Sequence, residues 1–277
     1  MRRLVTAVNA RRVIFVLLDG LSARSARSCM GYLESLREAG RAFGGFVRCE
    51  LPALSRPLYH CLITGLRPAE SGLVHNTCWQ AAPAQSCFHL AGAQGRITAA
   101  AAFYWFSEIV NAHPFAPERE RVTADPTRPI RHGLFHSCDS YPDAQVFLDA
   151  QSLLTAHAPD LLLVHSLGID HAGHLHGHDS PGYRNAAREA DMLLARHMPG
   201  WLEQGYQLMI TSDHGMNADK THNGNSPEER EVPVWLVGEA FRPDALRPPE
   251  QTEWCGTICE VMKLKAHGKT FCREVLR

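Results

Sequence analysis

Four short apolar runs dominate the chain, and each has polar residues at or near one end. The runs cover residues 13–18, 161–165, 206–210 and 232–237. Their length and continuity are typical of strands buried on both faces of a sheet. The polar residues that accompany them are Asp19, Asp170, His174, Asp213, His214 and His222. Because ligands of open α/β sheets collect at the carboxyl ends of strands, we expect these six side chains to converge.

Helical patterns alternate with the apolar runs. The spacing of apolar residues and the stop signals predict helices over residues 29–39, 58–64, 143–157, 181–197 and 256–265. Further strands are expected at residues 46–51 and 95–102. Such alternation predicts an α/β fold with a largely parallel central sheet sandwiched by helices.

Two stretches lack this regular pattern. Residues 76–94 are rich in loop signals, and residues 111–142 hold many Pro, Arg and His with little periodicity. We expect both to contain cap or lid insertions into a single domain that spans residues 1–277. A chain of 277 residues, of which 45% are hydrophobic, is suited to one large α/β domain with a sizeable core.

Charge and cysteine content exclude several classes of protein. The net charge of −1 gives no electrostatic reason to expect a nucleic-acid polymer or an anionic membrane as a partner. The nine cysteines are scattered and form no CxxC pair, which favours free thiols in a reducing compartment. The run at 13–18 is too short for a signal peptide, and no run reaches the ~18 apolar residues of a membrane span. We therefore expect a cytoplasmic protein.

The six polar residues have the types and the spacing of metal ligands. Asp170 and His174 stand four positions apart, which places both on one face of a helical turn. Asp213 and His214 follow a buried strand, where a carboxylate and an imidazole are costly unless an ion neutralises them. The first pair alone is a weak signal, and the second is somewhat stronger because of the strand before it. Asp19 alone is also weak, because it could cap a helix. The combination of all these strand-end positions is much more specific.

Ser55 has two interpretations. It lies at the expected start of a helix, where a serine is most often an N-cap. It could instead be a nucleophile, because a helix N-terminus offers backbone N–H groups and a positive dipole end to a phosphoryl group.

These segments resemble the motifs of the alkaline phosphatase superfamily, in its type I phosphodiesterase/nucleotide pyrophosphatase branch, to which phosphonoacetate hydrolase is closely related. The similar segments, in the family's order, are Asp19-Gly20, Pro52-Ala53-Leu54-Ser55-Arg56-Pro57, residues 64–72, Asp170-His171-Ala172-Gly173-His174, Ser212-Asp213-His214-Gly215-Met216, and His222 ahead of Glu231-Val232-Pro233. The resemblance implies an alkaline phosphatase-like core with a reduced cap.

The resemblance also implies a two-zinc site, with Mn²⁺ as the alternative metal. One ion would be held by Asp19, Asp213, His214 and the oxygen of Ser55, and the other by Asp170, His174 and His222. Ser55 would attack a small-molecule phosphate or phosphonate ester and form a phospho-serine intermediate that water hydrolyses. The implied activity is a phosphodiesterase or nucleotide pyrophosphatase.

The chain departs from the family at one position close to the nucleophile. Relatives usually carry Asn three residues after the nucleophile, to bind a phosphoryl oxygen, whereas this chain has Leu58. Arg56, Tyr59 or Asn76 could take over this contact. Phosphonate hydrolysis and phosphomonoester hydrolysis remain alternatives, as does a non-catalytic phosphate-binding module. Sulfatase activity is disfavoured, because Tyr59 stands where the sulfatase motif has Arg.

Overall fold

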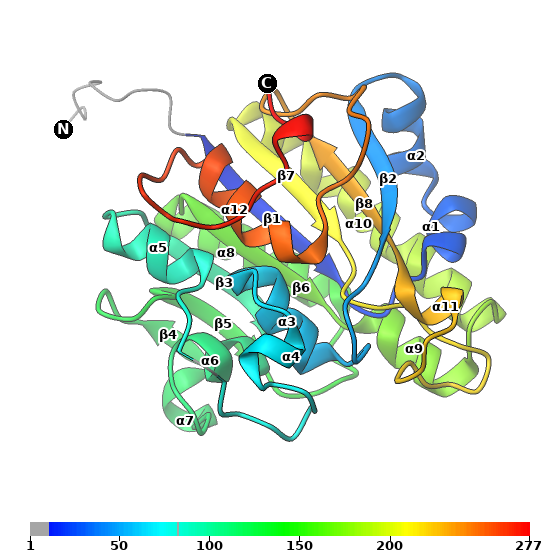
Figure 1. Ribbon diagram of the computed structural model, residues 1–277, viewed down its shortest axis with the longest axis horizontal. Coiled ribbons are helices and arrows are strands. Elements are labelled where there is room, and N and C mark those ends of the chain that lie inside the picture. Colours follow the sequence, from blue (N-terminus) through cyan, green and yellow to red (C-terminus); the bar gives the residue numbers. More distant parts are fainter. Residues whose placement is uncertain (1–10, 82) are drawn as a thin grey trace.

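The computed structural model describes residues 11–81 and 83–277, in which helices cover both faces of a sheet of eight strands (Figure 1). The strand order is β2-β8-β7-β1-β6-β3-β5-β4. The strands are β1 (Arg12–Leu18), β2 (Ala42–Arg48), β3 (Thr98–Phe103), β4 (Val122–Ala124), β5 (His132–His136), β6 (Leu161–Ser166), β7 (Tyr206–Thr211) and β8 (Glu231–Val237). The central strands β7, β1, β6, β3 and β5 are parallel, whereas β8, β2 and β4 pair antiparallel. The prediction of a largely parallel sheet is therefore confirmed.

Strand β1 lies in the middle of the sheet and divides the core into two layers. Phe15 points to one side, where it packs against Trp254 with ring centroids 5.6 Å apart. Val16 points to the other side and joins the cluster that contains Trp201. Residues 13–18 are buried completely, so the continuous apolar run reflects burial on both faces of the strand.

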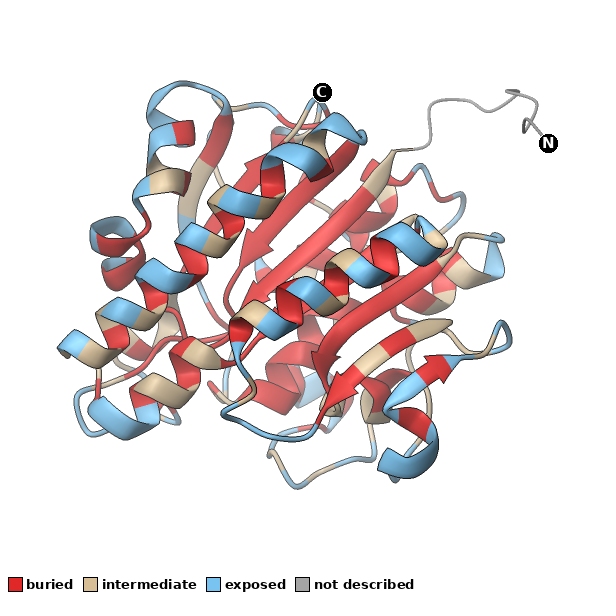
Figure 2. Ribbon diagram, turned by 180° about the vertical axis from the view of Figure 1, so that it is seen from behind, coloured by how far each residue is buried: buried red, intermediate tan, exposed pale blue. Residues whose placement is uncertain are grey.

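The helices form two layers. They are α1 (Ala23–Cys29), α2 (Gly31–Glu38), α3 (Ser55–Thr64), α4 (Pro68–Ser71), α5 (Cys87–Ala93), α6 (Trp105–Val110), α7 (Pro117–Glu120), α8 (Asp143–His157), α9 (Gly168–His176), α10 (Pro181–Glu203), α11 (Pro227–Arg230) and α12 (Gln251–Val261), with a final 3-10 turn at Arg273–Val275. Helices α3, α5, α6 and α12 cover one face, and α1, α2, α8 and α10 the other. In Figure 2, the long helices of the second layer are buried where they meet the sheet and exposed on the opposite side.

Several element boundaries differ from the sequence prediction. The helix expected at 29–39 is two helices, α1 and α2, which meet at Met30. Helix α3 begins at Ser55 rather than at Leu58, because Pro57 is accommodated within the first helical turn. The last helix begins at Gln251, five positions earlier than expected.

The two stretches expected to be irregular, residues 76–94 and 111–142, contain ordered elements. Within residues 111–142, β5 belongs to the central sheet and pairs in parallel with β3 from Ala99–His132 to Phe103–His136. Helix α5, within residues 76–94, contributes Phe88 to the core. The cap or lid expected in these two ranges can therefore involve only the parts outside β5 and α5.

Across residues 11–81 and 83–277, no helix combines the length and the apolar character that a membrane crossing requires.

Candidate metal centre and active site

The six predicted ligands come together at the carboxyl edge of three neighbouring strands. Strands β7, β1 and β6 lie side by side and in parallel, so the residues that follow them emerge at the same edge. The side chains form two groups, in each of which the ligand atoms lie within 4.8 Å of one another. The first group is Asp19, Asp213 and His214, and the second is Asp170, His174 and His222.

In the first group, all three side chains are fully buried. His214 Nε2 lies 3.2 Å from Asp213 Oδ2 and 3.5 Å from Asp19 Oδ1. The other oxygen of Asp213, Oδ1, accepts a hydrogen bond from the Gly20 backbone N–H at 3.3 Å. Asp213 Oδ2 is thereby left facing the histidine and the second aspartate.

In the second group, α9 places two ligands one helical turn apart. His174 Nε2 lies 3.4 Å from Asp170 Oδ2, and His222 Nε2 lies 3.8 Å from Asp170 Oδ1. The imidazole rings of His222 and His214 stack with centroids 3.6 Å apart, which joins the second group to the first. His174 is the most exposed ligand, so the second group opens toward solvent.

Backbone carbonyl groups orient all three imidazoles in the same way. Each Nδ1 atom lies near one carbonyl oxygen: that of Gly215 for His214 (2.9 Å), of Lys220 for His174 (2.9 Å) and of Ala53 for His222 (2.7 Å). Because a carbonyl oxygen can only accept, each Nδ1 carries the proton and each Nε2 presents a lone pair. Metal-binding histidines are typically held in this manner.

Three carboxylate oxygens in the centre are buried without a hydrogen-bond partner among the described residues. They are Asp19 Oδ1, Asp170 Oδ1 and Asp213 Oδ2. An unpaired buried carboxylate oxygen is costly, and three of them beside three imidazole lone pairs are a donor set suited to divalent cations. The residues present therefore fit the two-metal site that the sequence resemblance implies.

The pKa values of the ligands point to the same conclusion. Burial raises the pKa of Asp170 to about 7 and that of Asp213 to about 6. Burial and the neighbouring charge of Asp213 also raise the pKa of Asp19 well above its usual value. Burial lowers the pKa of His214 and His222 to about 3, so both imidazoles are neutral. A bound cation would reverse the effect on the carboxyl groups and keep them ionised.

Ser55 lies beside the first group rather than capping its helix. The backbone of Leu54 occupies the N-cap position of α3, and Ser55 is the first helical residue. Its Oγ lies 3.0 Å from His214 Nε2, and the residue is only 5% exposed. The hydroxyl is thus placed at the ligand atoms and at the N-terminal end of the α3 dipole.

Two side chains behind Asp19 orient its carboxyl group. The Tyr59 hydroxyl donates a hydrogen bond to Asp19 Oδ2, and His165 Nε2 lies 3.1 Å from the same oxygen. His165 Nδ1 accepts from the Phe103 backbone N–H at 3.3 Å, so the proton of this imidazole is on Nε2 and is donated to Asp19. Oδ2 is therefore occupied, and Oδ1 is left for a metal ion.

The role of His165 was missed from sequence. His165 is not among the candidate residues named from the sequence, yet it is fully buried near the end of β6. Its position inside the apolar run 161–165 was the available signal, because a polar residue in a buried strand needs a partner.

The three candidate substrate contacts occupy different environments. Tyr59 is buried against Asp19, as described above. The Arg56 guanidinium donates to Glu108 Oε2 at 2.7 Å and lies over the ring of Trp105, so its charge is already paired. Asn76 is half-buried, and its Oδ1 accepts from the backbone N–H of Arg56 at 3.1 Å. This contact leaves the Asn76 amide nitrogen as an available donor near the backbone of Arg56.

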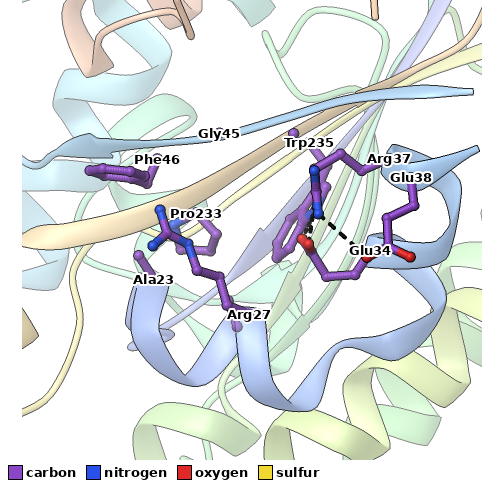
Figure 3. Close-up of a pocket in the computed structure, with 11 residues that line it drawn as sticks. Ala23, Arg27, Glu34, Arg37, Glu38, Gly45, Phe46, Pro233 and Trp235 are labelled. Carbon is purple, nitrogen blue, oxygen red and sulfur yellow. Dashed lines mark hydrogen bonds and ion pairs between the residues drawn. The ribbon is translucent and has the colours of Figure 1, made fainter. Parts of the chain in front are cut away.

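A separate groove of about 500 Å³ lies between helices α1 and α2 and strands β2 and β8 (Figure 3). Arg27, Phe46 and Trp235 are among its lining residues, and Glu34 and Arg37 form an ion pair at one end. None of the Asp, His or Ser residues of the candidate centre lines this groove, so we do not assign it to the reaction.

A sequence match over most of the described chain places the protein in a known family. Residues 13–229 match the family model of type I phosphodiesterase / nucleotide pyrophosphatase, and the chain belongs to that family. Among solved structures, murine ectonucleotide pyrophosphatase / phosphodiesterase 5 has the same fold, with a TM-score of 0.76 and 14% identity, covering 96% of this chain and 100% of the murine chain. The human protein of that name gives a TM-score of 0.70 at 15% identity, over 95% of this chain and 97% of its own.

Curated proteins that are similar to this chain in sequence are named as transferases, unlike the structural neighbours. GPI ethanolamine phosphate transferase 2, catalytic subunit, of Homo sapiens is 26% identical over 269 residues, which is 91% of this chain and 26% of the human protein. GPI ethanolamine phosphate transferase 2 of Aspergillus fumigatus is 24% identical over 248 residues, which is 83% of this chain and 30% of the fungal protein. The chain thus spans less than a third of the length of either relative.

Proposed function

We propose that this chain is a metal-dependent hydrolase of phosphoric esters, acting on phosphodiesters or pyrophosphates through a phospho-serine intermediate at a two-zinc site. The observation that carries the proposal is the position of Ser55 Oγ, 3.0 Å from His214 Nε2, beside three unpaired carboxylate oxygens. A phosphate-binding module would have no need for a nucleophile placed at two complete ligand sets. Family membership supports the same reaction class.

Two groups of residues would hold the ions. One ion would be held by Asp19, Asp213, His214 and the oxygen of Ser55. The other would be held by the Asp170 group, which consists of Asp170, His174 and His222. When bound, the ions would supply positive charge for the phosphoryl oxygens and lower the pKa of a coordinated hydroxyl. The donor set of Asp and His admits Zn²⁺ as well as Mn²⁺.

The residues of the chain would act in two steps. Ser55 would release its hydroxyl proton to solvent, and its Oγ would attack phosphorus. A P–O bond would form as the bond to the leaving oxygen breaks, and that oxygen would take up a proton from solvent. Water would then attack the phospho-serine and release the phosphoryl group with the serine hydroxyl restored. The Asn76 amide nitrogen, fixed by the Arg56 contact, would donate to a phosphoryl oxygen in place of the Asn that relatives have at the position of Leu58.

A second candidate is transfer to an alcohol instead of water. The named transferases above support it, because one of them matches 91% of this chain. The first step would be unchanged, and an alcohol acceptor would take the phosphoryl group from Ser55 in the second. In both candidate reactions the substrate would be a small-molecule phosphate or phosphonate ester. The product would differ, because the phosphoryl group would pass to water in one and to an alcohol in the other. A cytoplasmic location is part of the hydrolase proposal.

Elemental analysis and a panel of chromogenic esters test the proposal. The panel contains a phosphodiester, a phosphomonoester, a phosphonate ester and a sulfate ester, each with added Zn²⁺ or Mn²⁺. We expect two ions per chain and fastest cleavage of the diester. Adding an alcohol such as ethanolamine reports on transfer, because a transferase would form a phosphorylated alcohol at the expense of the hydrolysis product.

Variants separate the nucleophile from the metal ligands. Ser55→Ala is expected to abolish turnover and to keep both ions, whereas the exposed Ser152→Ala should behave as the parent protein. Asp213→Asn and His174→Ala should each lower the metal content. Normal turnover in Ser55→Ala would exclude this nucleophile, and unchanged metal content in both ligand variants would refute the site.

A further inference from the structure

The carboxylate of Glu229 is a buried charge outside both metal-binding groups. Glu229 lies in the short helix α11 and is 3% exposed. Its Oε1 accepts hydrogen bonds from Asn217 Nδ2 at 2.9 Å and from the Gly224 backbone N–H at 3.0 Å. Its Oε2 accepts from the Ser226 backbone N–H at 2.9 Å. Hydrogen bonds to an ionised acceptor are the stronger kind, so this carboxylate fixes all three donors.

These donors lie along the loop formed by residues 217–226. Asn217 begins the loop, Ser226 ends it, and Gly224 lies between them. The contact with Gly224 is close: a Cβ added to that residue would lie 2.5 Å from Glu229 Oε2. The loop is therefore closed around the carboxylate, and its shape depends on a group that no ion would touch.

The loop supplies the surroundings of both histidines in the Asp170 group. His222 is part of the loop, and its Nδ1 bonds the carbonyl of Ala53. His174 lies outside the loop, but its Nδ1 bonds the loop carbonyl of Lys220, a residue held at a positive φ of 65°. Such a backbone conformation costs about 1 kcal/mol or more for a residue other than glycine and persists only where the surroundings impose it.

The Asn217 side chain connects Glu229 to the loop backbone just before His222. Its amide nitrogen donates to Glu229, and its Oδ1 accepts from the Thr221 backbone N–H at 3.1 Å. Thr221 directly precedes His222. The side chains of Glu229 and Asn217 thus fix the backbone on both sides of the His222 ligand.

The first group has no comparable dependence on the Glu229 side chain. Asp19 directly follows β1, and only Ser212 separates Asp213 from the end of β7. The contact between this segment and residue 229 is made by the backbone, where the Gly215 N–H donates to the Glu229 carbonyl at 2.7 Å. That contact survives a change of the side chain.

We propose that Glu229 is a positioning residue that shapes the 217–226 loop and so assembles the Asp170–His174–His222 metal group selectively. This inference rests on the proposed two-ion function. Glu229 does not contact the reacting atoms; it acts through Asn217 and the loop backbone on two ligands. Loss of its charge is expected to weaken one of the two ions and to spare the other.

The test is a stepwise metal titration of Glu229→Gln with Zn²⁺ in competition with a chromophoric chelator. Glutamine keeps the size but presents an NH₂ group to a backbone N–H that now lacks an acceptor. We expect one of the two ions, the one that His174→Ala also weakens, to lose affinity by about 10-fold or more, the range found when groups that orient metal ligands are removed. The other ion should keep its parent affinity. Glu231→Gln, which removes the same charge two residues away, is the matched control, because its side chain forms no ion pair in the described chain.

A second variant guards against a general folding defect. Asn217→Ala removes one of the three donors and the link to Thr221, and should weaken the same ion by a smaller factor. His174→Ala provides the reference for loss of the Asp170 group, and combining it with Glu229→Gln should produce no further loss if both act on one ion. Far-UV circular dichroism confirms that each variant is folded.

The outcomes separate this inference from the proposed function. If the parent protein binds fewer than two ions, the two-ion function itself fails. If the parent binds two ions and Glu229→Gln binds both with parent affinity, or weakens both equally, Glu229 has no selective role. Selective loss in Glu229→Gln and Asn217→Ala, with parent behaviour in Glu231→Gln, supports the proposal.

Discussion

Replacing Tyr59 with Phe isolates one hydrogen bond to a metal ligand. The ring of Tyr59 stacks on Phe106 with centroids 4.6 Å apart, and phenylalanine retains that packing. What is lost is the hydroxyl that donates to Asp19 Oδ2, while His165 continues to donate to the same oxygen at 3.1 Å. The substitution therefore changes one interaction in a fully buried setting without opening a large cavity.

The expected loss of metal affinity follows from the charge of Asp19 in the metal-free and in the metal-bound protein. A hydrogen bond to an ionised carboxylate contributes about 1.5–3 kcal/mol, and one to a neutral group about 0.5–1.5 kcal/mol. Burial raises the pKa of Asp19 and so favours the neutral form of its carboxyl group in the metal-free protein, whereas a bound metal ion favours the ionised form. The difference of about 1–1.5 kcal/mol corresponds to roughly tenfold weaker metal binding. The metal-free protein should lose only about 0.5–1.5 kcal/mol of unfolding free energy.

The assay is a competition titration with a chromophoric chelator, paired with urea unfolding of the metal-free protein. Tyr206→Phe is the matched control. Its hydroxyl is buried and donates to the Pro159 carbonyl at 2.8 Å, at the opposite end of the sheet. It should lose a similar amount of stability and no metal affinity. Parent-like binding in Tyr59→Phe, or an equal loss in Tyr206→Phe, would refute the reasoning.

Two further predictions concern the protons released on metal binding and the room for a Cβ atom at two glycines. Because the pKa values of Asp170 and Asp213 are raised to about 7 and about 6, both carboxyl groups hold protons at pH 6 that metal binding must displace. Metal binding also displaces any proton held by Asp19, whose pKa is raised as well. Calorimetry in buffers of different protonation enthalpy should therefore record about one more proton released at pH 6 than at pH 8; equal release at both would contradict the raised values of Asp170 and Asp213. Gly20→Ala should cost about 1–3 kcal/mol more in urea unfolding than Gly40→Ala, because a Cβ on Gly20 would lie 2.8 Å from Asp170 Cα. Both glycines have positive φ, but a Cβ on Gly40 would meet no atom within 4 Å. Equal losses of stability would therefore show that backbone strain, and not the close contact, sets the cost.

The sheet and its ligand-bearing edge could be predicted from sequence because both depend on local signals. Continuous apolar runs indicate strands buried on both faces, and β1, β6 and β7 appear close to where they were expected. Parallel pairing then places Asp19, Asp170 and Asp213 at one edge. The family resemblance was confirmed by the match over residues 13–229.

Contacts that depend on tertiary packing could not be predicted. Nothing near His165 in the sequence indicates that its partner is Asp19, which is 146 positions away. Likewise, the pairing of Arg56 with Glu108 depends on how α3 and α6 pack. The strand β5 was missed because His132 and His136 at its ends interrupt the apolar pattern that predicts strands. The roles of Ser55 and of the individual ligands remain predictions that the proposed variants test.

The central position of β1 affects how the protein can be synthesised. This strand is the first element of the described chain, yet both of its partners, β6 and β7, lie beyond residue 160. A growing chain therefore carries a strand that is apolar from residue 13 to residue 18 and has no partner until residues beyond 160 have been made. Non-local pairing of this kind slows folding and exposes strand edges to aggregation. We expect emerging chains to need protection by a chaperone until β7 has left the ribosome.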